Sequence, residues 1–173
     1  MRRIILITGG QRSGKSAYAE GLAHRLTDRP VYMATAHIWD EEFRQRVQRH
    51  QENRGPEWTN IEEEMFLSRH DVNGRVVVVD CVTLWCTNYI TACSDIHKDL
   101  ADIKTEFDKF TSQDATFIFV TNEIGMGGVA MNQVQRQFTD LQGWVNQYIA
   151  AKADQVVMMV SGIPVTVKGD SLL

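Results

Sequence analysis

The segment that organises the chain is Ile4-Ile5-Leu6-Ile7-Thr8-Gly9-Gly10-Gln11-Arg12-Ser13-Gly14-Lys15-Ser16. Its apolar run predicts a buried strand, and the alanine-rich stretch after Ser16 has the spacing of a helix. Between them lies Gly-x-x-x-x-Gly-Lys-Ser, the Walker A motif, whose backbone amides surround phosphate oxygens at a helix N-terminus. Lys15 would reach the β- and γ-phosphates, and Ser16 would bind Mg²⁺. A glycine loop can also be a plain turn, but the strand before it and the helix after it favour phosphate binding.

Length and composition limit the class of protein. The 173 residues suit one domain, residues 1–173, with a core large enough to fold without disulfides. A net charge of −4 does not fit the basic surface of a nucleic-acid-binding protein, so we expect no nucleic-acid partner. No apolar run reaches the length of a membrane span. Cys81, Cys86 and Cys93 lack a C-x-x-C spacing and predict reduced thiols in a cytoplasmic protein.

The rest of the chain alternates between helical and strand-like apolar patterns. This alternation predicts a doubly wound α/β fold, with a mostly parallel sheet flanked by helices. Two apolar runs separated by Ser161-Gly162 predict a C-terminal antiparallel hairpin. The predicted strands are 4–7, 31–34, 75–80, 116–120, 155–160 and 163–168, and the predicted helices are about 14–27, 40–54, 81 onward, 95–110 and 133–153.

Three polar side chains follow predicted strands, at the sheet edge where ligands of parallel α/β folds gather. Asp80 ends the β-branched run 75–80 and fits a Walker B acid that holds Mg²⁺ opposite Ser16. The alternative for Asp80 is a cap for the next turn. Thr35 is either a nucleotide contact or part of a small-residue turn. Glu123 precedes a glycine loop and could contact substrate or metal, or hold that loop.

Residues 40–54 predict a helix that is rich in arginine within an acidic chain. Phe43, Val47, His50 and Arg54 recur at helical spacing and share one face. One interpretation is a solvent-exposed charged face with an incidental histidine. The other is a nucleophile, because cationic neighbours lower the pKa of an imidazole and keep it neutral, as attack at phosphorus requires. The same arginines would offset the charge of a polyphosphate.

Several segments match the motifs of one enzyme family. The most specific combination joins the Walker A motif to His50-x-x-x-Arg54 and Asn122-Glu123-x-Gly125. Further matches are Tyr32-Met33-Ala34-Thr35-Ala36, Asp80-Cys81-Val82-Thr83-Leu84-Trp85 and Ser161-Gly162-Ile163-Pro164. Over nearly its whole length the chain resembles the bifunctional adenosylcobinamide kinase / adenosylcobinamide-phosphate guanylyltransferase family of cobalamin biosynthesis.

The resemblance implies a RecA-like P-loop NTPase fold, a homotrimer, and two reactions at one nucleotide pocket. In the first, the γ-phosphate of ATP or GTP passes to the hydroxyl of adenosylcobinamide. In the second, a histidine attacks the α-phosphorus of GTP and passes GMP to adenosylcobinamide phosphate, which gives adenosylcobinamide-GDP. By its position in the motif, His50 is that histidine. The implied nucleotide contacts are Gly9, Gly10, Gln11, Arg12, Ser13, Gly14, Lys15, Ser16, Ala34, Thr35, Ala36, Gln51, Glu52, Asn53, Arg54, Glu62 and Asp80.

Two other functions would use the same Walker A motif. A small-molecule kinase would need only the phosphate loop, with His50 in a structural role. A nucleotide-dependent binding or switch protein would bind a partner without turning over a corrinoid. The sequence has no additional basic or hydrophobic interaction surface for such a partner. We therefore expect a bifunctional transferase that uses Mg²⁺, GTP and ATP.

Overall fold

The computed structural model describes residues 1–38, 54–92 and 95–170. Within these residues, seven strands form one sheet in the order β3-β2-β4-β5-β1-β6-β7. All neighbouring pairs are parallel except β6 and β7, which form an antiparallel hairpin. The strands are β1 Arg3–Gly9, β2 Val31–Ala34, β3 Thr59–Glu62, β4 Val76–Asp80, β5 Thr116–Val120, β6 Gln155–Val160 and β7 Ile163–Lys168.

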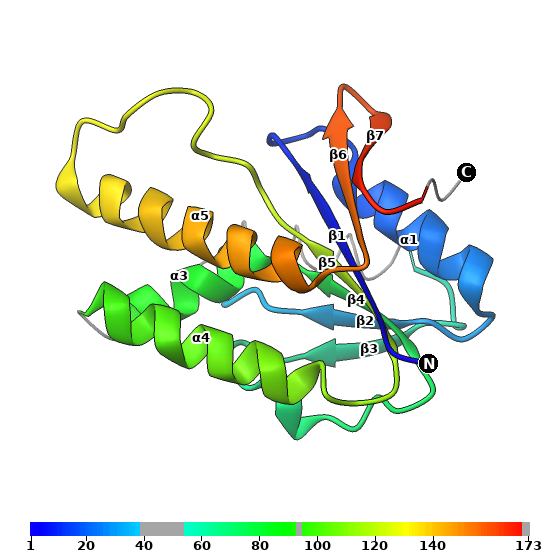
Figure 1. Ribbon diagram of the computed structural model, residues 1–173. Coiled ribbons are helices and arrows are strands. Elements are labelled where there is room, and N and C mark those ends of the chain that lie inside the picture. Colours follow the sequence, from blue (N-terminus) through cyan, green and yellow to red (C-terminus); the bar gives the residue numbers. More distant parts are fainter. Residues whose placement is uncertain (39–53, 93–94, 171–173) are drawn as a thin grey trace.

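Helices cover both faces of this sheet (Figure 1). Helix α1 packs on one face, and α3, α4 and α5 lie together on the other, with α4 alongside α5. The described helices are α1 Lys15–Leu26, α3 Val82–Ala92, α4 Ile96–Phe110, α5 Gln133–Lys152 and the short 3₁₀ helix η1 Leu67–Arg69. None of them is long and apolar enough to cross a membrane.

The central strands are apolar on both faces because each face packs against helices. Along β1, Ile4 and Leu6 belong to the core under α3, α4 and α5, whereas Ile5 and Ile7 belong to the core under α1. The larger core is rich in aromatic rings, including Phe107 of α4, which is fully buried. Two hydrophobic layers therefore fix the sheet, and the ends of its strands have a defined position.

The predicted strands and helices that fall within the described residues are confirmed, with small shifts at their ends. Asp95, for example, is the N-cap of α4, because its carboxylate accepts hydrogen bonds from the amides of His97 and Lys98. Strand β3 was not predicted as a strand. Its sequence, Thr-Asn-Ile-Glu, lies at the sheet edge and lacks the apolar pattern of a buried strand. The predicted helix 40–54 lies outside the described residues, apart from Arg54.

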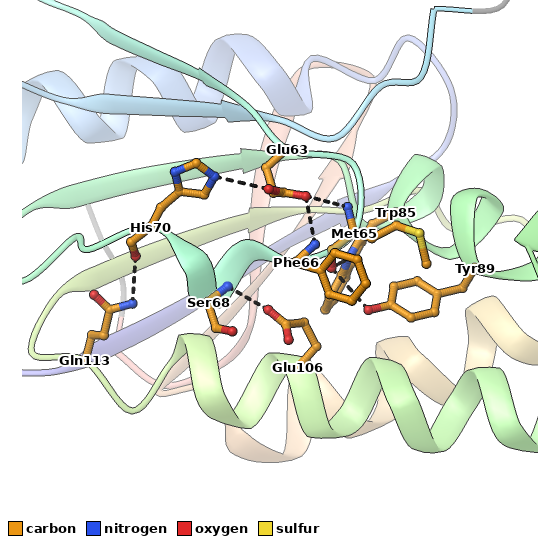
Figure 2. Close-up of polar contacts among 9 residues, drawn as sticks. All are labelled: Glu63, Met65, Phe66, Ser68, His70, Trp85, Tyr89, Glu106 and Gln113. Atoms are coloured by element: carbon orange, nitrogen blue, oxygen red, sulfur yellow. Dashed lines mark hydrogen bonds and ion pairs between the residues drawn. The ribbon is translucent and has the colours of Figure 1, made fainter.

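The connection from β3 to β4 is fastened to helices α3 and α4 by polar contacts (Figure 2). The Met65 carbonyl accepts hydrogen bonds from Trp85 Nε1 at 2.9 Å and from the Tyr89 hydroxyl at 3.1 Å. The Ser68 amide donates to Glu106 Oε1 at 2.6 Å. Trp85 and Tyr89 also pack edge to face, so this pair is part of the core and not a ligand platform. These contacts hold the chain that follows β3 against α3 and α4.

Glu63 gives this connection a dependence on pH. Its Oε1 accepts from the amides of Met65 and Phe66 at 3.1 and 2.9 Å, and its Oε2 lies 3.2 Å from His70 Nε2 (Figure 2). Partial burial raises the pKa of Glu63, but the two amides and the His70 ring outweigh burial and lower the pKa overall. A carboxylate whose pKa falls on folding stabilises the fold above its unfolded-state pKa. That contribution disappears as the pH drops through the folded-state pKa.

We expect Glu63→Gln to reduce the free energy of unfolding by about 1 kcal/mol at pH 6.5, because the charged hydrogen bonds are lost. The difference from wild type should shrink between pH 6.5 and pH 3.5, because the pH approaches the folded-state pKa of Glu63 and protonation removes the same charge in wild type. Urea unfolding of both proteins at the two pH values measures it. An equal difference at both would mean that the charge of Glu63 does not matter.

Candidate active site

A cavity of about 530 Å³ lies where β2, β4 and β5 end and α1 begins. Loop residues 11–16 form one wall, and the ends of β2 and β4 contribute Ala34 and Asp80. Ala36 and Arg54 complete the set of predicted site residues that line it. The structure therefore brings the predicted phosphate loop and the predicted metal ligand Asp80 together at one edge of the sheet, where ligands of parallel α/β folds bind.

The glycine loop is held in a shape that leaves the N-terminus of α1 open. Gly14 has φ +92° and precedes Lys15, the first residue of the helix. No side chain caps the helix, so its first amides remain available as donors to an anion. The Ser13 carbonyl accepts a hydrogen bond from the Gly162 amide at 3.0 Å, which ties the loop to the turn between β6 and β7.

Lys15 is a buried cation with few partners inside the protein. Its Nζ donates to the Gly10 carbonyl at 2.5 Å and lies 3.4 Å from Ser13 Oγ. Burial lowers the pKa of Lys15, although the charge of Asp80 partly opposes this effect. Lys15 therefore lines the cavity as a cation whose hydrogen-bond partners among the described residues are neutral.

Asp80 lies at the end of β4 and is held by a residue of the neighbouring strand. Tyr32 of β2 donates its hydroxyl to Asp80 Oδ2 at 2.9 Å. Burial, followed by the negative charge of Asp80, raises the pKa of Tyr32, so the phenol stays protonated and remains a donor. Tyr32 also lines the cavity. In the sequence, Tyr32 was part of a segment that matches the family, and no role was predicted for it.

Thr35, one of the predicted nucleotide contacts, is fully buried and does not line the cavity. Its hydroxyl donates to the Cys81 carbonyl at 2.7 Å and accepts from the Cys81 amide at 2.9 Å. The Thr35 carbonyl in turn accepts from Asn88 Nδ2 at 2.7 Å. The side chain of Thr35 therefore joins the ends of β2 and β4, a role that its position in the sequence did not reveal.

The other predicted residues do not line the cavity or lie outside the described part of the chain. Gly9 and Gly10 support the loop without lining the cavity, and Glu62 is exposed at the end of β3. Glu123 holds its own loop, because its Oε1 accepts from the amides of Gly125 and Met126 at 2.6 and 2.9 Å. The residues that lie outside the described part of the chain are His50, Gln51, Glu52 and Asn53.

The cavity has a further wall that the predicted set omitted. Thr83 of α3, with Asn122 and Ile124 after β5, lines it. Thr83 Oγ1 accepts from the Asn122 amide at 2.9 Å, which joins this wall to the start of α3. Asn122 belongs to a segment quoted for the family resemblance, so the motif was a usable signal for it. Ile124 lies within the same matching segment, so the motif was a signal for it as well.

Arg54 has an unusually confined side chain for an arginine. It is 3 % exposed, and its Cζ lies 3.5 Å from the centroid of the Tyr32 ring. Its Nε donates to Asn60 Oδ1 at 3.0 Å, and its Nη1 lies 3.5 Å from Glu20 Oε1 of α1. The Trp58 ring packs edge to face against the Tyr32 ring, with the two ring centroids 6.0 Å apart. The chain is therefore firmly anchored at residue 54.

The sequence of this chain matches a known enzyme family. Residues 5–167 match the family described as cobinamide kinase / cobinamide phosphate guanyltransferase. The chain belongs to this family. It is 35% identical over 171 residues to the bifunctional adenosylcobalamin biosynthesis protein CobP of Pseudomonas aeruginosa, covering 96% of this chain and 98% of that protein. It is 36% identical over 181 residues to CobU of Escherichia coli, which has the same description, covering 95% and 99%.

Membership of the cobinamide kinase / guanyltransferase family confirms the resemblance seen in the sequence, and with it a transferase of cobalamin biosynthesis. The fold has wider relatives. The flagellar accessory protein FlaH of Methanocaldococcus jannaschii superposes with a TM-score of 0.51 at 13% identity, covering 97% of this chain and 79% of that one. This likeness concerns the fold alone and agrees with the predicted P-loop architecture.

Proposed function

We propose that this enzyme carries out both reactions at the one cavity. In the kinase reaction, the hydroxyl of adenosylcobinamide attacks the γ-phosphorus of ATP or GTP, the nucleoside diphosphate leaves, and the hydroxyl proton is released. In the guanylyl transfer, a ring nitrogen of His50 attacks the α-phosphorus of GTP and pyrophosphate leaves. A phosphate oxygen of adenosylcobinamide phosphate then attacks the GMP phosphorus. The P–N bond breaks, and adenosylcobinamide-GDP forms with neutral His50.

The observation that carries this proposal is that Arg54 lines the same cavity as Lys15 and Asp80. His50 is four residues from Arg54 in the sequence. Because a fully extended chain advances by at most about 3.5 Å per residue, the backbone of His50 lies within about 14 Å of that of Arg54. This limit on the distance from Arg54 supports a role for His50 at the same cavity.

The residues around the phosphates supply positioning and charge. Lys15 and the open amides of α1 would bind phosphate oxygens and offset the charge that develops in either transfer. The Ser16 hydroxyl and the Asp80 carboxylate are hard oxygen ligands of the kind that Mg²⁺ prefers beside phosphate oxygens and water. When bound there, Mg²⁺ would neutralise charge on the phosphates. Asp80 is already oriented by Tyr32, which fits this use.

The proposal extends to the remaining contacts and to the assembly. Ala34, Ala36, Gln51, Glu52, Asn53 and Glu62 would contact the nucleotide, as the family resemblance implies. The enzyme would act as a cytoplasmic homotrimer. Cys81 and Cys86, both buried free thiols, are compatible with a reducing compartment.

Incubation of the enzyme with GTP labelled at the α-phosphorus tests the covalent step. We expect label that survives base but is released by acid, as a phosphoramidate requires, and its complete loss in His50→Ala. GTP labelled at the γ-phosphorus is the control and should leave no label on the protein. Kinase activity in wild type without α-label would mean that the enzyme is only a kinase, with His50 in a structural role. Label retained in His50→Ala would assign the nucleophile to another residue.

A further inference from the structure

Tyr32 connects two parts of the site that are far apart in the sequence. Its hydroxyl bonds to Asp80, and its ring is covered by the Arg54 guanidinium at 3.5 Å. The Trp58 ring packs edge to face against the Tyr32 ring. Only 7% of Tyr32 is exposed, and the exposed part faces the cavity that Asp80 and Arg54 also line. The position of this one side chain therefore affects both neighbours.

The hydroxyl contact orients the Asp80 carboxylate. In the parallel register, Tyr32 pairs with Val78 and Ala34 pairs with Asp80, so Tyr32 and Asp80 point to the same face of the sheet. The phenol can thus reach along the neighbouring strand to Oδ2 and leave Oδ1 for another ligand. Groups that orient a metal-binding side chain in this way contribute about ten-fold to a hundred-fold to metal affinity.

The ring contact holds Arg54 in the wall of the cavity. A guanidinium that lies over an aromatic face and away from water is attracted by the π-electrons of the ring. Arg54 is additionally fixed by Asn60 of β3 and Glu20 of α1, so it joins three elements around the Tyr32 ring. Its Nη1 makes no hydrogen bond to the described residues, although it is buried near Glu20. The ring is therefore a main support for this end of the guanidinium.

We propose that Tyr32 is a positioning residue with two separable tasks. Its hydroxyl orients Asp80 for the metal–nucleotide complex, and its ring holds Arg54 in the wall of the cavity for the guanylyl transfer. The second task rests on the proposed function, because it assumes that His50 is the nucleophile. The first requires only that the cavity binds a nucleotide with Mg²⁺.

Tyr32→Phe removes the hydroxyl and keeps the ring. Its effect is measured as the affinity for GTP that carries a methylene bridge between the α- and β-phosphorus atoms, which His50 cannot cleave. With Mg²⁺ present we expect affinity to fall about ten-fold, because Asp80 loses its orienting donor. In EDTA, Tyr32→Phe and wild type should bind the methylene-bridged analogue with equal affinity. Equal losses in both conditions would indicate general damage to the pocket, and no loss in either would mean that the hydroxyl does not orient Asp80.

Tyr32→Leu removes the ring as well. We expect the rate of α-phosphate labelling to fall about ten-fold further than in Tyr32→Phe, because Arg54 loses its aromatic support. The kinase rate should fall no further, since that reaction does not use His50. If both rates fall together, or neither does, the Tyr32 ring has no separate effect on the labelling reaction that uses His50. Circular dichroism of both variants checks that they are folded.

Tyr148 of α5 provides a matched control on the other face of the sheet. Its hydroxyl donates to Asp108 Oδ2 at 2.7 Å, and Lys152 Nζ lies 4.5 Å from its ring centroid. Tyr148→Phe and Tyr148→Leu thus remove the same kinds of contact away from the cavity and should change neither affinity nor rates. A wild type that binds the Mg²⁺ nucleotide but shows no labelling would contradict the proposed function, and the Tyr32→Phe comparison would still decide the first task.

Discussion

Replacing Lys15 by methionine is expected to reduce both transfer reactions by about a thousand-fold or more. Lys15 is the cation at the start of α1, and among the described residues its buried ammonium group donates to the Gly10 carbonyl and lies 3.4 Å from the Ser13 hydroxyl. Pre-positioned charge in a dry site is among the largest contributions to phosphoryl transfer, and one cationic group there contributes about 10³-fold to 10⁵-fold. Methionine keeps the length of the side chain and removes only the charge and its donors.

Stability should respond in the opposite sense. Because burial lowers the pKa of Lys15, the charged form is less favourable in the folded protein than in the unfolded chain. A lysine with this shift costs stability at every pH below its folded-state pKa. We therefore expect Lys15→Met to unfold at the wild-type temperature or above it. Loss of activity together with a lower melting temperature would point to misfolding.

The measurement compares both rates, nucleotide affinity and the melting temperature for wild type and Lys15→Met. Lys109→Met, at an exposed position near the end of α4, is the control for removal of a positive charge. It should leave the rates unchanged. Near-normal rates in Lys15→Met would show that the loop binds its nucleotide without this cation, and would remove Lys15 from the catalytic residues.

The fold could be predicted where the chain carries a strong local pattern. The β-branched run that became β4 and the paired apolar runs of β6 and β7 have periodicity and turn signals of their own. Strand β3 has neither, since its residues are polar and its pairing with β2 comes from tertiary context. An edge strand of this kind is recognised only once its neighbour is in place.

Part of the site was also predictable, because its residues belong to strong local sequence patterns. The loop residues and Asp80 follow from motif and strand end, and the structure places them around one cavity. The roles of Tyr32 and Thr35 depend on which strands are neighbours and in which register, because each contacts a residue 46 or 48 positions away. Glu123 shows the same limit. Its two interpretations, ligand contact and loop support, were equivalent in the sequence, and the hydrogen bonds that Glu123 accepts from Gly125 and Met126 support the second.

Gly9→Ala is expected to destabilise the protein by about 3 kcal/mol, which combines overpacking with backbone strain. A Cβ at Gly9 would lie 2.6 Å from the Met159 carbonyl oxygen and 2.8 Å from Ser13 Oγ. Met159 is paired with Gly9 in the sheet, so the backbone of β6 or the phosphate loop would have to move. The residue also has φ +149°, which L side chains rarely adopt.

Gly10→Ala is the matched control, because a Cβ at Gly10 would meet nothing within 4 Å. For a chain of this size, about 3 kcal/mol corresponds to a fall of about 10 °C in melting temperature for Gly9→Ala. Gly10→Ala should melt close to wild type. Nucleotide affinity should fall in Gly9→Ala alone, since displacement of the loop moves the Ser13 and Lys15 groups that face the phosphates. Similar melting temperatures for the two variants would mean that β6 yields without cost, and that close packing of β1 against β6 does not fix the loop.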